Sequence, residues 1–158
     1  MGQTTIFCIY ASFCLSSFFS SSIIKKLGHQ KSLFLSGLTY CIYISTGLVI
    51  ITEMPIPKSV KWCIVILWAL ICGLGASILW VSQGSYISET ADSTRKSQLF
   101  GLFWIFQSSG TVLGDILIIF ILGKVDNITY SLLTPIFVIF GSLLFLCLPN
   151  TSYSNSLD

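Results

Sequence analysis

Long apolar stretches alternate with short polar ones along the whole chain. Five apolar stretches are long enough to cross a hydrocarbon core of roughly 30 Å, which takes about 20 helical residues. They cover residues 5–24, 33–51, 62–87, 99–122 and 131–148. Lipid supplies no hydrogen-bond partners, so a helix, which satisfies its own backbone groups, is the expected structure of each. The pattern predicts an all-α, polytopic membrane bundle of about five helices over 1–148, followed by a polar tail at 149–158.

The composition agrees with a membrane location. Hydrophobic residues make up 54% of the chain and charged residues only 9%, whereas a soluble domain has about 25% charged residues. The net charge of +2 is small and its Lys and Arg are dispersed, which argues against a nucleic-acid-binding surface. We therefore expect an integral, multi-pass protein whose surroundings are membrane lipid.

The connections at 25–32, 52–61, 88–98 and 123–130 are short, so neighbouring helices should run antiparallel. The first and third connections carry Lys25, Lys26, Lys31, Arg95 and Lys96, and the other side carries Lys58, Lys61 and Lys124. Basic residues concentrate on the cytoplasmic side of membrane proteins. This balance predicts an external N-terminus and a cytoplasmic loop that contains Lys25, Lys26, Gly28 and Lys31.

Two glycosylation sequons are present. Asn127-Ile128-Thr129 lies in the fourth connection, which the predicted topology places outside, so Asn127 is a candidate acceptor. Its closeness to the membrane favours an unmodified side chain. The second sequon begins at Asn150, in the predicted cytoplasmic tail, and should be unused.

Small and polar residues share one side of the third and of the fourth predicted helix when residues are placed at 100° per step. On the third helix they are Ala69, Cys72, Gly73, Ala76, Ser77, Trp80, Gln83 and Gly84, and on the fourth Trp104, Gln107, Ser108, Gly110, Thr111, Gly114 and Asp115. Small residues let helices approach closely in lipid. We expect both faces to pack against helices, with Gly110 and Gly114 as a G-x-x-x-G pair and both tryptophans in the bundle core.

Asp115 is a carboxylate well inside a predicted span, where an ionised group costs about 2.5 to 3.5 kcal/mol or more. Two interpretations remain open. It binds a proton, an ion or a substrate amine in a central cavity, together with Gln83 and Gln107. Alternatively, it is protonated or hydrogen-bonded to one of those glutamines and only fixes the packing.

Other polar residues suggest structural roles. Ser12, Ser16 and Ser20 repeat every four residues, which favours a close-packing seam over a water path. His29, beside Lys31 in the first connection, is expected to be a solvated loop histidine rather than a pH sensor.

No catalytic site, metal site or cofactor site is predicted. The six cysteines all lie inside apolar runs without metal-ligand or C-x-x-C spacing, so they are interpreted as small packing residues. The chain has one histidine and no G-x-S-x-G, Walker or H-E-x-x-H motif, and a non-enzymatic protein is expected.

Residues 73–86, GLGASILWVSQGSY, resemble the G-x-G-A-x-x-L-W-x-x-Q-G-x-Y signature of the unc-ninety-three-like ion channel regulatory proteins. Residues 100–110, FGLFWIFQSSG, followed by Gly114, resemble the next helix of that family. Lys26-Leu27-Gly28 resembles the loop after the family's second helix. The similarity extends over nearly the whole chain.

The family belongs to the major facilitator superfamily, so the resemblance implies helices two to six of an N-terminal half. It implies a non-enzymatic regulator of another membrane protein, such as a potassium channel. The alternative is a fragment of a secondary transporter that moves a small solute or proton. The sequence departs from the pattern at Lys25, which replaces an acidic residue, and at Asp115, which replaces an Asn.

The chain begins almost directly in a span and has an odd number of spans. We therefore expect it to be part of something larger. Its partner would be another integral membrane protein or the missing remainder of the fold.

Overall fold

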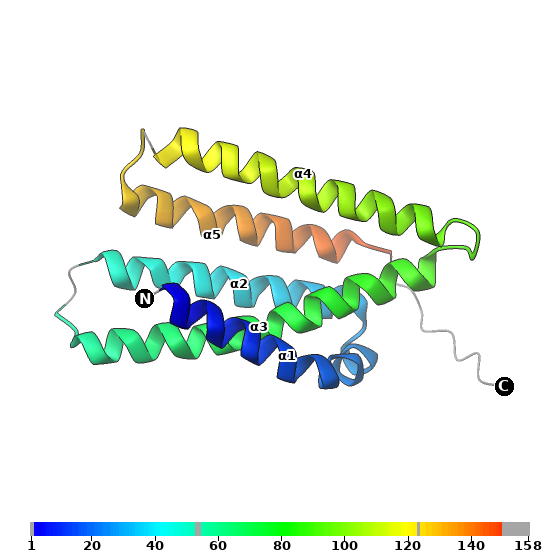
Figure 1. Cartoon of the computed structure of the whole chain (residues 1–158), viewed down its shortest axis with the longest axis horizontal. Coiled ribbons are helices and arrows are strands. Elements are labelled where there is room, and N and C mark those ends of the chain that lie inside the picture. Colours follow the sequence, from blue (N-terminus) through cyan, green and yellow to red (C-terminus); the bar gives the residue numbers. More distant parts are fainter. Residues whose placement is uncertain (1, 53–54, 123, 150–158) are drawn as a thin grey trace.

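The computed structural model describes residues 2–52, 55–122 and 124–149, which form a bundle of long helices (Figure 1). The helices are α1 (Gly2–Leu27), α2 (His29–Ile51), α3 (Lys58–Thr90), α4 (Lys96–Leu122) and α5 (Asn127–Leu144), followed by the 3₁₀ turn η1 (Phe145–Cys147). Consecutive helices run in opposite directions, and the described residues contain no strand. The predicted all-α, five-helix architecture is confirmed.

Five helices of the described chain are long and apolar enough to cross a membrane. Their outward surfaces are strongly hydrophobic: Phe18 is 79% exposed and Phe137 is 72% exposed. Soluble proteins rarely expose contiguous apolar patches larger than a few hundred Å². This surface is suited to lipid rather than to water.

The helices extend beyond most of the predicted spans, and the first connection shrinks to a single residue. Gly28 joins α1 to α2 with a φ of +79°, a conformation that glycine adopts without steric cost. Lys25 and Lys26 lie in the last turn of α1, and Lys31 lies in the first turn of α2. Basic side chains suit a helix C-terminus and can extend their charged ends to the membrane surface, so the helix continues through them.

The long helix α3 packs against both α1 and α2, and α2 also packs against α5. Gly73 of α3 lies against the backbone oxygen of Ile9 in α1, and Gly75 lies against the side chain of Thr39 in α2. A side chain at either glycine would collide with these atoms. Close backbone approach is therefore what these small residues provide.

The serines of α1 form a seam with α3. The hydroxyl of Ser12 donates to the carbonyl oxygen of Leu70 at 2.7 Å. The Ser77 Oγ lies 2.8 Å from the Ser16 Oγ and 2.9 Å from the Ser20 Oγ. Ser20 and Ser77 are fully buried. The predicted close-packing seam is confirmed.

Candidate functional site

Helix α4 is the least packed element of the bundle. It lies along the edge beside α5 (Figure 1), makes only sparse contact with α3 and α5, and has no buried residue among those whose side chains are described. An added Cβ at Gly110 or Gly114 would meet open space. The small-residue face of α4 is thus uncovered around Gly110 and Gly114.

An aromatic cluster links α4 to α3. The rings of Trp80 and Trp104 are stacked at 5.8 Å with an angle of 22° between their planes. Phe103 meets Trp80 and Trp104 edge-on at 6.3 and 5.7 Å. Trp104 nevertheless remains 55% exposed, so this cluster sits at the border of the uncovered face.

An open hollow follows the same face. It has a volume of about 410 Å³ and is lined by Phe103, Phe106, Gln107, Gly110 and Thr111. The Thr111 hydroxyl donates to the Gln107 carbonyl oxygen at 3.0 Å, which leaves the side-chain amide of Gln107 as the polar group of the hollow.

The three polar residues singled out from the sequence lie in different surroundings. Asp115 and Gln107 are exposed on α4, whereas Gln83 is half-buried on α3. The side-chain oxygen of Gln83 is buried and has no hydrogen-bond partner within the described residues. No hydrogen bond joins these three side chains in the described part of the chain, so their joint role stays a prediction.

The two small-residue faces therefore have different surroundings. On α3, Gly73, Ala76 and Ser77 are buried inside the bundle. Gly84 is half-buried, yet an added Cβ there would meet no atom within 4 Å. On α4, Gln107 and Asp115 are exposed, and an added Cβ at Gly110 or Gly114 would meet no atom within 4 Å.

His29 was expected to be a solvated loop residue, and this expectation is wrong. It is the first residue of α2 and is only 7% exposed. Its Nε2 lies 3.1 Å from the Glu89 Oε2, its Nδ1 lies 3.3 Å from the Ser82 Oγ, and the Tyr86 ring meets it edge-on at 6.0 Å. Its partners lie on α3, more than 50 residues away in the sequence, so no local pattern could have found them.

The same end of the bundle anchors the C-terminal part of the described chain. The side-chain amide of Gln30 donates to the carbonyl oxygens of Leu146 and Leu148 at 2.6 and 2.7 Å. The Tyr86 hydroxyl donates to the carbonyl oxygen of Pro149 at 3.4 Å. Polar contacts thus connect α2 and α3 with η1 and the residues that follow it, at the end of the bundle that carries Lys25, Lys26 and Lys31.

The candidate acceptor Asn127 is the exposed first residue of α5. Asp126 caps this helix by accepting from the Thr129 hydroxyl at 2.7 Å and from the Thr129 backbone N–H at 3.1 Å. These hydrogen bonds lower the pKa of Asp126 below its ordinary value. Modification of Asn127 stays a prediction, and the second sequon at Asn150 and the tail at 150–158 lie outside the described residues.

The cysteines pack without disulfides in the part of the chain that the structure describes. All six are free, and Cys41 and Cys72 are buried. No group of metal-ligating side chains gathers within residues 2–52, 55–122 and 124–149.

The fold and its apolar surface define an integral, multi-pass membrane protein built from helices. The chain belongs to the family described as ion channel regulatory protein UNC-93, whose family model matches residues 1–158.

Curated relatives agree with this assignment. The chain is 32% identical over 117 residues to the UNC93-like protein MFSD11 of Xenopus tropicalis, covering 74% of this chain and 24% of the relative. It is 32% identical over 138 residues to the protein unc-93 homolog A of Mus musculus, covering 80% of this chain and 28% of the relative. These relatives are of the major facilitator type. No solved structure matches.

The relatives are much longer than this chain. The matched region spans 24% of the Xenopus tropicalis protein and 32% of a second MFSD11-like protein, from Xenopus laevis. The chain thus spans about a quarter to a third of the length of these relatives.

Proposed function

We propose that this chain is a non-enzymatic regulatory membrane protein, and that the uncovered face of α4 binds a helix of another integral membrane protein. An ion channel is the partner class that the family description suggests, and we propose a potassium channel as the first example to test. In this proposal the small-residue face of α3 builds the bundle, and the face of α4 makes the lateral contact.

The observation that carries the proposal is the exposure of Asp115. This carboxylate lies within a membrane-spanning helix and no part of the described bundle covers it. Facing lipid, an ionised carboxylate costs about 2.5 to 3.5 kcal/mol or more, so such residues normally face protein or water. Gln107 and the open surroundings of Gly110 and Gly114 lie on the same half of α4, and small residues allow close helix crossing.

Co-purification with co-expressed potassium channels tests the proposal. Gly110→Leu and Gly114→Leu place bulky side chains on the uncovered face and should reduce channel recovery severalfold. Ser109→Leu is the matched control, because helical geometry places Ser109 on the opposite side of α4. An unchanged channel current in the presence of the chain, or equal recovery with all three variants, would contradict the proposal.

A second candidate function is favoured by the buried side-chain oxygen of Gln83, which has no partner among the described residues. Transporter sites lie near the membrane midplane and use such polar groups. In this case Gln83, Gln107 and Asp115 contribute to a proton or solute site that further helices complete. Proton-coupled flux in liposomes that Asp115→Asn abolishes would favour the carrier over the regulator.

A further inference from the structure

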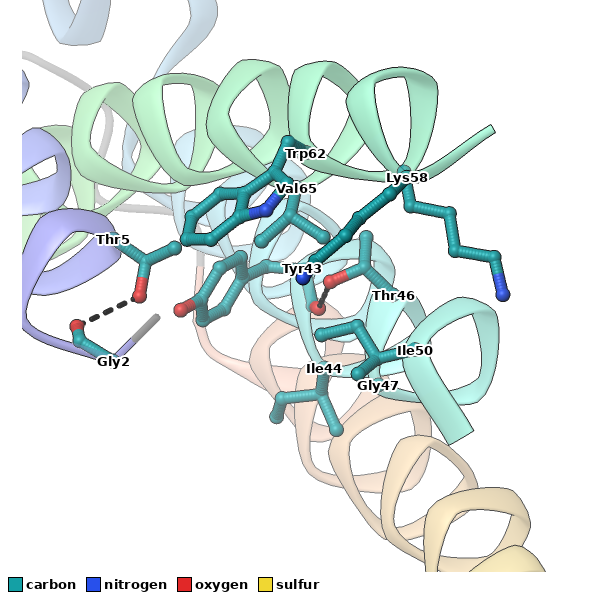
Figure 2. A pocket seen from close by; sticks show the side chains of 11 residues that line it. Gly2, Thr5, Tyr43, Ile44, Thr46, Gly47, Ile50, Lys58, Trp62 and Val65 are labelled. Atoms are coloured by element: carbon teal, nitrogen blue, oxygen red, sulfur yellow. Dashed lines mark hydrogen bonds between the residues drawn. The ribbon is translucent and has the colours of Figure 1, made fainter. Parts of the chain in front are cut away.

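A pocket opens between α1, α2 and α3 at the end of the bundle that holds the α2–α3 connection (Figure 2). Its volume is about 410 Å³. The walls come from Tyr43, Thr46 and Ile50 of α2 and from Lys58, Lys61 and Trp62 of α3, and the first turn of α1 closes the space.

The wall of this pocket is mostly apolar. The Thr46 hydroxyl donates to the Tyr43 carbonyl oxygen at 2.6 Å, and the Thr5 hydroxyl donates to the Gly2 carbonyl oxygen at 2.9 Å. Both hydroxyls therefore satisfy nearby backbone groups. What faces an occupant is the Tyr43 and Trp62 rings and aliphatic side chains such as Ile50, so the body of the occupant should be hydrocarbon.

The charge at the pocket is positive. Lys58 and Lys61 contribute two ammonium groups, and no acidic residue occurs among the residues that line the pocket in the described chain. The Lys61 ammonium donates to the Thr52 carbonyl oxygen at 3.0 Å, which fixes its position and leaves two of its three donors. The polar end of an occupant should therefore be an anion.

The position of the pocket along the helices places it at the boundary between the hydrocarbon core of the membrane and the lipid headgroups. Lys58 and Lys61 lie in the first turn of α3, and Thr46 and Ile50 lie in the last turns of α2. Tyr and Trp are enriched at this level of a membrane, where one end of the side chain is apolar and the other is wet.

We propose that this pocket binds one molecule of an anionic phospholipid. Its acyl chain lies along Tyr43, Trp62 and Ile50, and its phosphate contacts Lys58 and Lys61. The site is separate from the face of α4 and does not depend on the regulatory function.

Trp62 serves as the reporter for this site. The full chain is placed in nanodiscs that contain either phosphatidylglycerol or phosphatidylcholine with brominated acyl chains, since bromine quenches indole fluorescence on contact. The difference between the wild type and Trp62→Phe isolates the signal of Trp62. We expect brominated phosphatidylglycerol to quench this signal at lower lipid fractions than brominated phosphatidylcholine.

Charge variants decide whether the lysines are responsible. Lys58→Gln and Lys61→Gln should each weaken the preference for the anionic lipid about fivefold, whereas Lys58→Arg and Lys61→Arg should retain it. Lys124→Gln is the matched control, because Lys124 belongs to the α4–α5 connection, which lies at the same end of the bundle as the α2–α3 connection (Figure 1), and it does not line the pocket. Helix content measured by circular dichroism shows whether each variant is folded.

Three results would overturn the proposal. They are equal quenching of Trp62 by both lipids, equal loss of preference in Lys124→Gln, and no quenching of Trp62 by either lipid in the folded chain. The last result would mean that a protein segment fills the pocket.

Discussion

His29 shows how much one polar side chain contributes at the bundle end. It is buried, lies within hydrogen-bond distance of Ser82 and Glu89, and packs against Tyr86. Replacing it by Ala removes two polar contacts and leaves a void, so we expect a loss of about 2 to 3 kcal/mol in the free energy of unfolding. Thermal unfolding in detergent measures this loss.

Lys31→Ala is the control for this prediction. Lys31 lies on the same helix, two residues away, and is exposed. Its replacement should change the unfolding temperature little, as surface substitutions usually do. An equal effect of both substitutions would show that the His29 contacts contribute nothing specific.

The stability of the first turn of α5 should depend on pH through its N-cap residue, Asp126. Hydrogen bonds from the Thr129 hydroxyl and backbone N–H lower the pKa of Asp126, so the folded chain favours the ionised carboxylate. The resulting stabilisation is present above the pKa of the unfolded chain and is lost as the pH falls through the lower, folded pKa. We expect the Thr129 amide to be protected from hydrogen exchange at neutral pH and to lose protection in acid.

Asp126→Asn separates the charge from the cap. Asparagine is also a good N-cap residue, so protection of the Thr129 amide should persist but no longer depend on acid pH. Asp126→Ala should remove the protection at every pH. Protection of the wild type that does not change in acid would contradict the role of the carboxylate.

At the scale of helices, close approach of α3 to its neighbours should dominate stability. A Cβ at Gly73 would collide with the Ile9 backbone oxygen and the Ser12 side chain, whereas a Cβ at Gly84 would meet nothing within 4 Å. Gly73→Ala should therefore cost about 1 to 3 kcal/mol through overpacking. Gly84→Ala should be neutral or stabilising by up to about 1 kcal/mol, because alanine favours the helix. Unfolding in mixed detergent measures both, and equal losses would contradict the packing seen at Gly73.

The number of helices and the serine seam could be predicted because both depend on local patterns. Apolar length defines a span, and a four-residue repeat places Ser12, Ser16 and Ser20 on one side of a helix. The short connection at Gly28 could not be predicted in the same way. Lysines beside it indicated a loop, but their long side chains allow the helix to continue to the membrane surface.

At the scale of the whole molecule, the sequence could not tell which small-residue face packs inside the bundle. The faces of α3 and α4 both carry small and polar residues at helical spacing, yet Gly73 and Ser77 are buried while Gly110 and Gly114 are uncovered. Neighbour choice depends on contacts between residues far apart in the chain. For the same reason, neither the pairing of His29 with Glu89 nor the pocket beside Trp62 could be predicted from the sequence.

Orientation is the property of the whole molecule that the charges predict most directly. Five basic residues lie at the end that holds the α1–α2 and α3–α4 connections and three at the other end, so the first end should be cytoplasmic. Thr94 and Val125 lie in connections at opposite ends, and neither contributes charge. With the six native cysteines replaced, an impermeant maleimide should label Thr94→Cys in sealed microsomes, whose outer surface is the cytoplasmic one. Val125→Cys should react only after the membrane is permeabilised. Reversed labelling would contradict the predicted topology. It would also place Asn127 on the cytoplasmic side, where glycosylation does not occur, so Asn127 would no longer be a candidate acceptor.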